Sequence, residues 1–384
     1  MHPIVRLSAC ALLIAASQGF AQVSSGAGPA PVRPTSTAAA SPAEPDATAA
    51  KPKPVRNPAF YSTDVLVNSQ SAGERHAATA RALGQVVVRL TGNPQAALNT
   101  VIRRAAANVE GLTTNYAFRQ DSETVNGVPT YKTILAVMFD PDGVDALIAA
   151  AGLKYWTAER PKPILWLAID DGRGPRLVTS QQPNVVKPLA TRGLERGIRY
   201  LLPAGTAAEQ ASVTSIWGLN AQAMEPLTNR YGNNAQLVGK VFRQPPGWTG
   251  AWVLSQAGVE LARWSFSDTD PRRVIASGVD EGANAIAKRD AVSLDTGAAG
   301  LYAIDVLGVN SQSDFIRLMS HLQSMAVVRK VTVIQASPEQ LRLQLDLGIG
   351  MKGFRTMVGT GDVLRALPEA GTAGSAGVSR FELQ

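Results

Sequence analysis

The sequence of 384 residues has few of the side chains that enzymes most often use for chemistry. Its single cysteine, Cys10, lies in an amino-terminal apolar segment that we expect to be removed. Disulfide bonds, thiol catalysis and cysteine-ligated metals are therefore excluded from the mature chain. His2 lies in the same segment, which leaves only His76 and His321. Two histidines are too few for a zinc site of the usual kinds, so we interpret both as structural or solvent-facing.

The serine-nucleophile motif and the P-loop motif for phosphate binding are also missing. No G-x-S-x-G sequence, which would place a serine on a strained turn, occurs in the chain. Gly348-Ile-Gly350-Met-Lys352-Gly353 and Gly359-Thr-Gly361 superficially suggest a phosphate cradle, but they do not match G-x-x-x-x-G-K-[ST], and we interpret them as loop glycines. We therefore assign no catalytic, cofactor-binding or metal-binding residue and predict no cofactor.

Charged residues do not gather in runs of one sign. Lysine and arginine number 37 against 30 aspartates and glutamates, which gives a net charge of +7. The basic residues are scattered and are not interleaved with aromatic residues, as they are in many nucleic-acid-binding proteins. We interpret the charge as a contribution to solubility and predict no nucleic-acid partner.

The amino terminus has the pattern of an export signal. Arg6 precedes the apolar run LSACALLIAA, and Gly19-Phe20-Ala21 offers small residues at the −3 and −1 positions, which predicts a signal peptide over residues 1–21. Cys10 precedes most of the apolar run, which argues against lipoprotein anchoring at this residue. Since no other segment approaches the roughly 18 apolar residues of a membrane span, we expect a periplasmic protein of the bacterial cell envelope without a transmembrane segment.

Composition and pattern divide the rest of the chain. Residues 22–58 are dense in Pro, Ala, Ser and Thr, which predicts a disordered linker. After it we predict an α+β protein of three small units. They are an amino-terminal domain over 60–154, a middle α/β domain over 163–291 and a carboxyl-terminal ferredoxin-like domain over 300–384.

The amino-terminal domain is predicted to follow a β-α-α-β-β-α order, a variant of the split β-α-β plan. Its clearest element is the helix of Ser71–Pro94, for which the spacing predicts an inward face that includes Ala77 and Ala80. Gly92 and Pro94 end this helix. The remaining elements are a strand at Thr63–Val67, a helix at Gln95–Ala107, a hairpin of Thr113–Gln120 and Thr130–Phe139 around Asn126-Gly127, and a helix opened by Asp140-Pro141.

The other two domains are predicted from the same signals. In the middle domain, three alternating strands suit an antiparallel meander with one covered face. Its predicted elements are a strand at Ile164–Asp170, a helix at Leu189–Arg199, a short strand at Tyr200–Leu202, a helix at Asn220–Tyr231, the meander at Ala235–Gln244, Gly250–Gln256 and Val259–Phe266, and a helix from Asp270 to Ala291. The last domain reads β-α-β-β-α-β, with VSRFELQ as an edge strand.

A family resemblance rests on the first domain. The run GERHAATARALGQVVVRLTGNP, with the Tyr116-containing strand and TYKTILAVMFDP, resembles a bacterial envelope family catalogued as domain of unknown function number two thousand and sixty-six. The motif comprises Arg75, a small-residue helix and V-x-R-L-T-G ending at Gly92, and the likeness extends from about Phe60 to Asp290. The resemblance implies an envelope compartment and no known activity.

Two features could carry function beyond this. Asp170 and Asp171 end a buried strand and could hold a divalent cation or act as acid and base, but we favour the interpretation as a DDGRG turn whose aspartates bond backbone amides. Among Trp248, Trp252 and Trp264, we interpret the second and third as core or sheet-surface anchors of the meander; the three would mark a binding face if they were exposed together.

We therefore predict a non-enzymatic periplasmic scaffold, adaptor or binding module with an envelope protein as its partner. A divalent-metal-dependent hydrolase using Asp170 and Asp171 is one alternative. A small-ligand sensor acting through the carboxyl-terminal domain is another. The sequence pattern indicates no oligomeric state.

Overall fold

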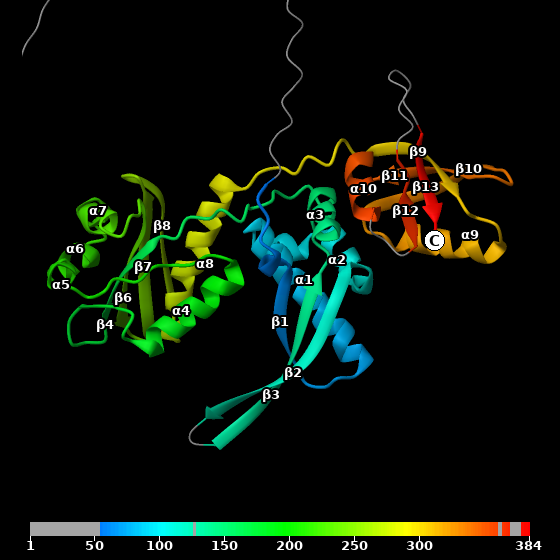
Figure 1. Cartoon of the computed structure of the whole chain (residues 1–384). Helices are drawn as coiled ribbons and strands as arrows, with labels where there is room; N and C mark the ends of the chain where they lie inside the picture. The colour runs from blue at the N-terminus through cyan, green and yellow to red at the C-terminus, as the bar shows by residue number, and fades with distance from the viewer. Residues whose placement is uncertain (1–53, 126–127, 360–362, 369–377) are drawn as a thin grey trace, which may run out of the picture. The chain divides into compact units, whose positions relative to one another are not determined.

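Three β-sheets organise the protein. The computed structural model describes residues 54–125, 128–359, 363–368 and 378–384. Over these ranges ten α-helices and thirteen strands form a mixed α+β structure with sheets of three, five and five strands (Figure 1). The predicted signal peptide, most of the predicted linker and the Asn126-Gly127 turn lie outside these ranges. Among the described helices, none combines the length and the apolar character that a membrane crossing requires.

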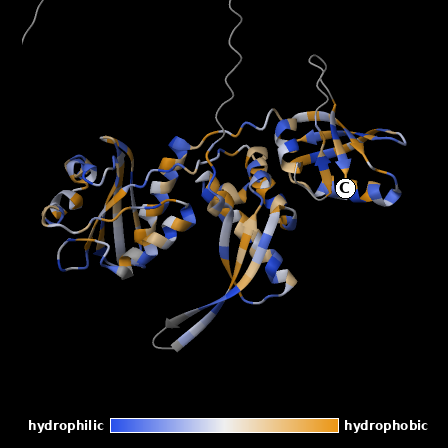
Figure 2. Cartoon of the chain, in the orientation of Figure 1, coloured by the Kyte–Doolittle hydropathy of each residue, from blue (hydrophilic) through white to orange (hydrophobic). Residues whose placement is uncertain are grey.

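The first sheet is antiparallel, with the order β1-β3-β2. Its strands are β1 (Ser62–Val67), β2 (Thr113–Val125) and β3 (Val128–Phe139). β1 pairs with β3 only from Thr133 to Met138, so the outer parts of β2 and β3 continue as a two-stranded ribbon (Figure 1). The hydrophobic residues of β3 are concentrated in the part that pairs with β1 (Figure 2).

Helix α1 (Ala72–Thr91) covers one face of this sheet with its apolar side chains. Both of its ends are set by residues next to them in the sequence. The Ser71 hydroxyl accepts a hydrogen bond from the Glu74 amide, and Gly92 ends the helix in the left-handed conformation with φ of 67°. The buried alanines are Ala78 and Ala82, whereas Ala77 is exposed and Ala80 is half-buried. The predicted inward face was therefore wrong in this turn, because alanines on neighbouring rows of a helix fit either choice.

The rest of the first unit follows the predicted order with one broken helix. The Gln95–Ala107 segment is the 3₁₀ turn η2 (Ala96–Leu98) followed by α2 (Thr100–Ala106), which Asn99 caps. A further 3₁₀ turn, η3 (Val109–Leu112), leads into β2. Helix α3 (Pro141–Ala150) begins as predicted, with the Asp140 carboxylate accepting from the Gly143 amide at 2.8 Å.

The middle sheet has the order β5-β4-β6-β7-β8. β4 runs parallel to β6, and β6, β7 and β8 form the predicted meander. Both faces of the sheet are covered, because Trp252 packs in a cluster with helices α4 and α8 and Trp166 packs in a cluster with α6 and α7. The elements are β4 (Ile164–Asp170), β5 (Arg176–Leu177), α4 (Pro183–Arg196), α5 (Ala207–Ala211), α6 (Val213–Trp217), α7 (Ala221–Asn229), β6 (Ala235–Gln244), β7 (Gly247–Gln256), β8 (Val259–Asp268) and α8 (Pro271–Asp290).

Several elements of the middle domain differ from the prediction. The expectation of one covered face was wrong for β6, because helices pack on both of its sides, whereas the partly buried apolar residues of β8 pack in the cluster of α4 and α8 alone. Helix α4 begins at Pro183, since proline fits the first turn of a helix, and it ends at the left-handed Gly197 instead of Arg199. Leu201 forms only an isolated bridge to Ile164 in place of a short strand. The short helices α5 and α6 and the strand β5 were not predicted.

The third sheet has the order β10-β11-β9-β13-β12, and β13 runs parallel to β9. β13 therefore lies inside the sheet, and the prediction of an edge strand for VSRFELQ was wrong because the unpredicted strand β12 covers its free side. The elements are β9 (Gly300–Leu307), α9 (Gln312–Ser324), β10 (Val328–Ala336), β11 (Leu341–Leu347), α10 (Met351–Val358), β12 (Leu364–Ala366) and β13 (Ser379–Leu383).

Helix α3 belongs to two hydrophobic clusters. Val144, Leu147 and Ile148 are buried against the first sheet, while Ala146 is buried in the core of the third sheet. Ala149 and Ala150 pack against the same third-sheet core. We call this contact between α3 and the third sheet the apolar joint.

Candidate functional site

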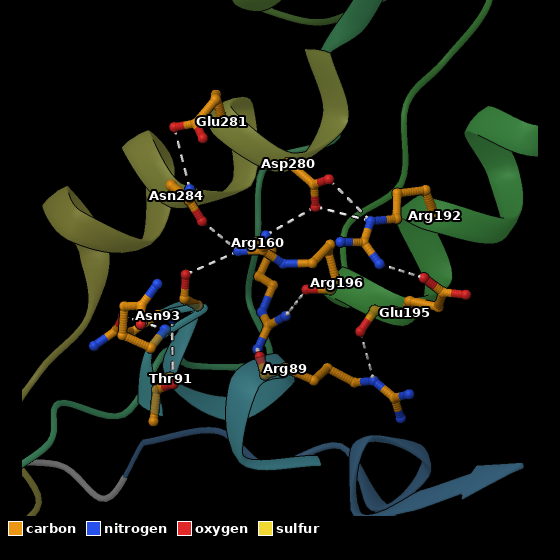
Figure 3. Close-up of polar contacts among 12 residues, drawn as sticks. Arg89, Thr91, Asn93, Arg160, Arg192, Glu195, Arg196, Asp280, Glu281 and Asn284 are labelled. Atoms are coloured by element: carbon orange, nitrogen blue, oxygen red, sulfur yellow. Dashed lines mark hydrogen bonds and ion pairs between the residues drawn. The ribbon is translucent and has the colours of Figure 1, made fainter. Parts of the chain in front are cut away.

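A cluster of charged side chains joins helices α1, α4 and α8 (Figure 3). Arg196 donates from Nη2 to the Gly92 carbonyl at 2.9 Å and to Asn284 Oδ1 at 2.5 Å, and from Nη1 to Asp280 Oδ1 at 2.9 Å. Arg192 donates from Nε to both oxygens of the same aspartate. We call this cluster the polar joint; it comprises Arg89, Arg160, Arg192, Arg196, Asp280 and Asn284.

Arg160 holds the carboxyl-terminal ends of two helices together. Its Nη2 donates to the Arg89 carbonyl in α1, and its Nη1 donates to the Gly197 carbonyl that follows α4, each at 2.9 Å. A cation is favourable at these positions because helix carbonyls carry partial negative charge at the carboxyl end. The guanidinium also stacks over the Trp156 ring, 3.8 Å from its centroid. Burial lowers the pKa of Arg160 to about 9.

Arg89 and Gly92 complete the polar joint. Arg89 donates from Nε to the Glu195 carbonyl and from Nη1 to the Ser62 carbonyl. Gly92 is in contact with α8, because a Cβ at this position would lie 2.0 Å from the Cβ of Ala287. The guanidinium donors of the polar joint are thus directed at backbone carbonyls, at the carboxylates of Asp280 and Glu195, and at side-chain oxygens of Asn284 and Thr63. Chemically, this arrangement fixes one helix against another.

A second buried polar group lies beneath α3. The Tyr61 hydroxyl donates to Asp145 Oδ1 at 2.7 Å, and Arg56 Nη2 lies 2.5 Å from Asp145 Oδ2. The Tyr155 hydroxyl is 3.1 Å from that of Tyr61. Burial raises the pKa of Asp145 to about 6, although Arg56 opposes the shift. Arg56 also bonds Asp142, so residues that the composition assigned to the linker are fixed to α3.

Asp170 and Asp171 are engaged within their own turn. Asp170 Oδ1 accepts hydrogen bonds from the Gly172 and Gly174 amides at 2.8 and 3.0 Å. Asp171 Oδ2 accepts from Arg176 at 2.8 Å, and this hydrogen bond lowers the pKa of Asp171. Across the described residues, no three His, Cys, Asp or Glu side chains are grouped as a metal site would need. These contacts favour the turn interpretation over the metal-dependent hydrolase.

The three tryptophans do not form a shared exposed face. Trp252 is fully buried, and Trp248 and Trp264 are partly buried and pack against the same cluster. Gly239 and Gly278 leave room for the Trp252 ring, since a Cβ on either glycine would lie under 3 Å from it. The residues are therefore part of the core of the middle sheet.

The two histidines lie in different settings. His76 Nδ1 is 2.7 Å from Glu110 Oε1, and this contact lowers the pKa of Glu110. His321 lies in the last turn of α9, where burial lowers its pKa. Both Glu110 and His321 line a cavity of 670 Å³ between the first unit and the third sheet. No sequence signal could have identified this cavity, because its walls come from segments far apart in the chain.

Comparison with known proteins gives a family match for the first unit. A family described only as a domain of unknown function, DUF8605, matches residues 55–157. The resemblance to family number two thousand and sixty-six was therefore wrong. The residues that carried it serve helix packing and a left-handed glycine cap at Gly92, which are general requirements and do not distinguish families. No curated protein matches the chain, and no solved structure does.

Proposed function

We propose that the protein is a non-enzymatic adaptor of the bacterial cell envelope, exported by a signal peptide over residues 1–21 and acting in the periplasm through a protein partner. The observation that carries this proposal is the polar joint, in which a cluster of charged side chains fixes helices of the same chain. A scaffold needs a fixed geometry, and buried charged hydrogen bonds between elements supply it because they are directional.

The proposed architecture has three units, over residues 60–154, 163–291 and 300–384. For the third we propose a ferredoxin-like fold, since its strand order β10-β11-β9-β13 and the parallel pairing of β13 with β9 agree with a β-α-β-β-α-β plan. β12 is then an addition at the edge. The fold has many users, so the adaptor role does not rest on it.

Cross-linking in vivo tests the adaptor role. A photoreactive residue replaces one exposed apolar side chain in each unit: Leu66, Val259 or Leu301, which are 57, 61 and 66% exposed. The expected result is a discrete heterologous cross-linked product from at least one position, dependent on irradiation. Replacement of the buried Leu83 provides the matched control and should give none. The absence of a product above background at all three exposed positions would contradict the proposal.

The hydrolase alternative has a separate test. A double Asp170→Ala/Asp171→Ala variant removes both carboxylates from an exposed turn. If the protein acts as an adaptor, the variant folds and complements a deletion strain as the wild type does. Loss of complementation by a folded double variant, with a single Asp171→Ala variant still active, would instead favour chemistry at Asp170.

A further inference from the structure

The 670 Å³ cavity has the size of a small-molecule site. One wall of the cavity is formed by η3 and the starts of β2 and α3. The opposite wall is formed by the ends of α9 and α10 and the start of β12. Leu147 and Leu364 form part of its buried floor, and Leu112, Met325 and Met357 add partly buried apolar wall. Methionine side chains adapt to ligands of irregular shape.

Acidic side chains line the cavity although the protein is basic overall. Its lining includes the carboxylates of Glu110 and Asp140, and no lysine or arginine is found among its described lining residues. Helices α9 and α10 both end at the cavity, through Ser324 and Val358, so partly negative carbonyl groups lie at its wall. Helix α3 begins there, but the Asp140 carboxylate accepts from the Gly143 amide and covers that positive end.

His321 adds a hydrogen-bonding group to this wall without adding charge at neutral pH. Its imidazole is half-buried, and burial lowers its pKa, so the neutral form dominates. Glu110 faces the same cavity and is paired with His76 on its other side. The cavity therefore combines an apolar floor with a polar rim of one sign.

We propose that this cavity binds a small amphiphile with an apolar body and a cationic head group, the body lying on Leu112, Leu147 and Met357 and the head lying between Glu110 and Asp140. This inference is independent of the adaptor role, since it rests on the cavity and not on the polar joint. A ligand in this position contacts both the first unit and the third sheet, and it stabilises the apolar joint by binding only when the two are together.

Calorimetric titration of the full chain tests the head-group preference. The probes are decylammonium, decanoate and decanol, which share one apolar body, and tetramethylammonium, which is a head group without a body. Decylammonium is expected to bind at one site at least about ten-fold more tightly than decanoate or decanol, a difference of about 1.4 kcal/mol. Tetramethylammonium is expected to show no saturable binding.

Variants locate the site. Met357→Trp fills the cavity and should abolish decylammonium binding, whereas Thr356→Trp, at the exposed neighbouring position, should leave it unchanged. Asp140→Asn keeps a good helix cap and, combined with Glu110→Gln, should weaken decylammonium binding several-fold and leave decanol binding unchanged. Circular dichroism of each variant checks that it is folded.

Three outcomes would overturn the proposal. Equal affinity for decylammonium and decanoate removes the cationic preference. Unchanged binding in a folded Met357→Trp variant places the amphiphile elsewhere. The absence of saturable decylammonium binding by the wild type eliminates the site, while the cross-linking result for the adaptor role stands separately.

Discussion

The first sheet meets its two neighbours through unlike contacts. At the polar joint, four arginines bond carbonyls and carboxylates across α1, α4 and α8. At the apolar joint, small side chains of α3 enter the core of the third sheet, and Ala150 lies close to Gly348, where an added Cβ would be 3.3 Å away. Directional hydrogen bonds are satisfied in one relative orientation of the two elements, whereas apolar contacts between small residues are nearly equal in energy in several orientations.

This difference explains where the cavity lies. Donors and acceptors at the polar joint must be satisfied in place, because an unpaired buried guanidinium or carbonyl is costly. The apolar joint has no buried donors or acceptors of this kind to pair, so the surfaces of the first unit and the third sheet beside it can remain apart. The 670 Å³ cavity lies between these surfaces. The polar joint is thus suited to fix orientation and the apolar joint to accommodate a ligand.

The largest effect is expected from Gly92→Ala. The new methyl group would lie 2.0 Å from the Ala287 Cβ at a left-handed backbone position, so we expect a loss of about 3–4 kcal/mol in the free energy of unfolding. Gly152→Ala is the matched control, because Gly152 has the same φ of 67° and open space around it, and it should lose only about 1 kcal/mol. Urea denaturation measures both. Equal losses would show that contact with α8 is unimportant.

Arg196→Met should have the next largest effect. Its side chain is 3% exposed and bonds Gly92, Asp280 and Asn284, so its removal should cost about 2–3 kcal/mol in unfolding free energy. Arg192→Met, with a side chain 40% exposed and the same aspartate as its partner, should cost under about 1 kcal/mol. Chemical denaturation of both variants compares them, and a ranking in the reverse order would sink the role assigned to burial.

Asp145 provides a pH-dependent comparison on the other side of α3. Because its folded pKa of about 6 lies above the unfolded value of 3.8, its stabilising contribution is complete below pH 4 and is lost as pH rises through 6. Relative to Asp145→Asn, the wild type should lose about 2–3 kcal/mol between those limits. Asp171→Asn should change the profile in the opposite sense and only below about pH 4, because the lowered folded pKa of Asp171 gives a stabilising contribution that is present above the unfolded value of 3.8 and is lost as pH falls. Urea denaturation across this range measures the profiles, and parallel profiles for wild type and Asp145→Asn would contradict the assignment.

The smallest effect is expected at the apolar joint. Ala150→Leu should cost about 1–2 kcal/mol through overpacking against the third sheet. Ala107→Leu, at an exposed position, should change the unfolding free energy by less than about 0.5 kcal/mol. The same denaturation assay applies. A loss at Ala150 as large as that at Gly92 would remove the contrast between the two joints.

Local signals in the sequence predicted the ends of elements well. Ser71, Gly92 and Asp140 act within one helical turn, so their capping roles need no knowledge of distant residues. The inward face of α1 was predicted wrongly at Ala77 and Ala80, because its alanines suit two neighbouring rows and packing against β1 and β3 selects the other row. β13 is an inner strand because β12 pairs with its outer side, and β12 has only three residues, which is too short for a recognisable pattern.

Neither joint could be predicted. Arg196 and Gly92 are 104 residues apart, and nothing in the sequence around either one indicates the other. The turn interpretation of Asp170 was available because its partners, Gly172 and Gly174, lie within four residues. The cavity depends on walls from η3 and α10, whose separation in the chain hides any common pattern.

The dual membership of α3 has a consequence for synthesis. A ribosome completes α3 at Ala150 long before it adds Gly300, where the strands of the third sheet begin. Until then the Ala146 side of the helix has no core to enter, and the nascent first unit presents an alanine surface to water. Truncation after Asp290 would leave that surface uncovered permanently, so a shortened chain should be the more prone to self-association.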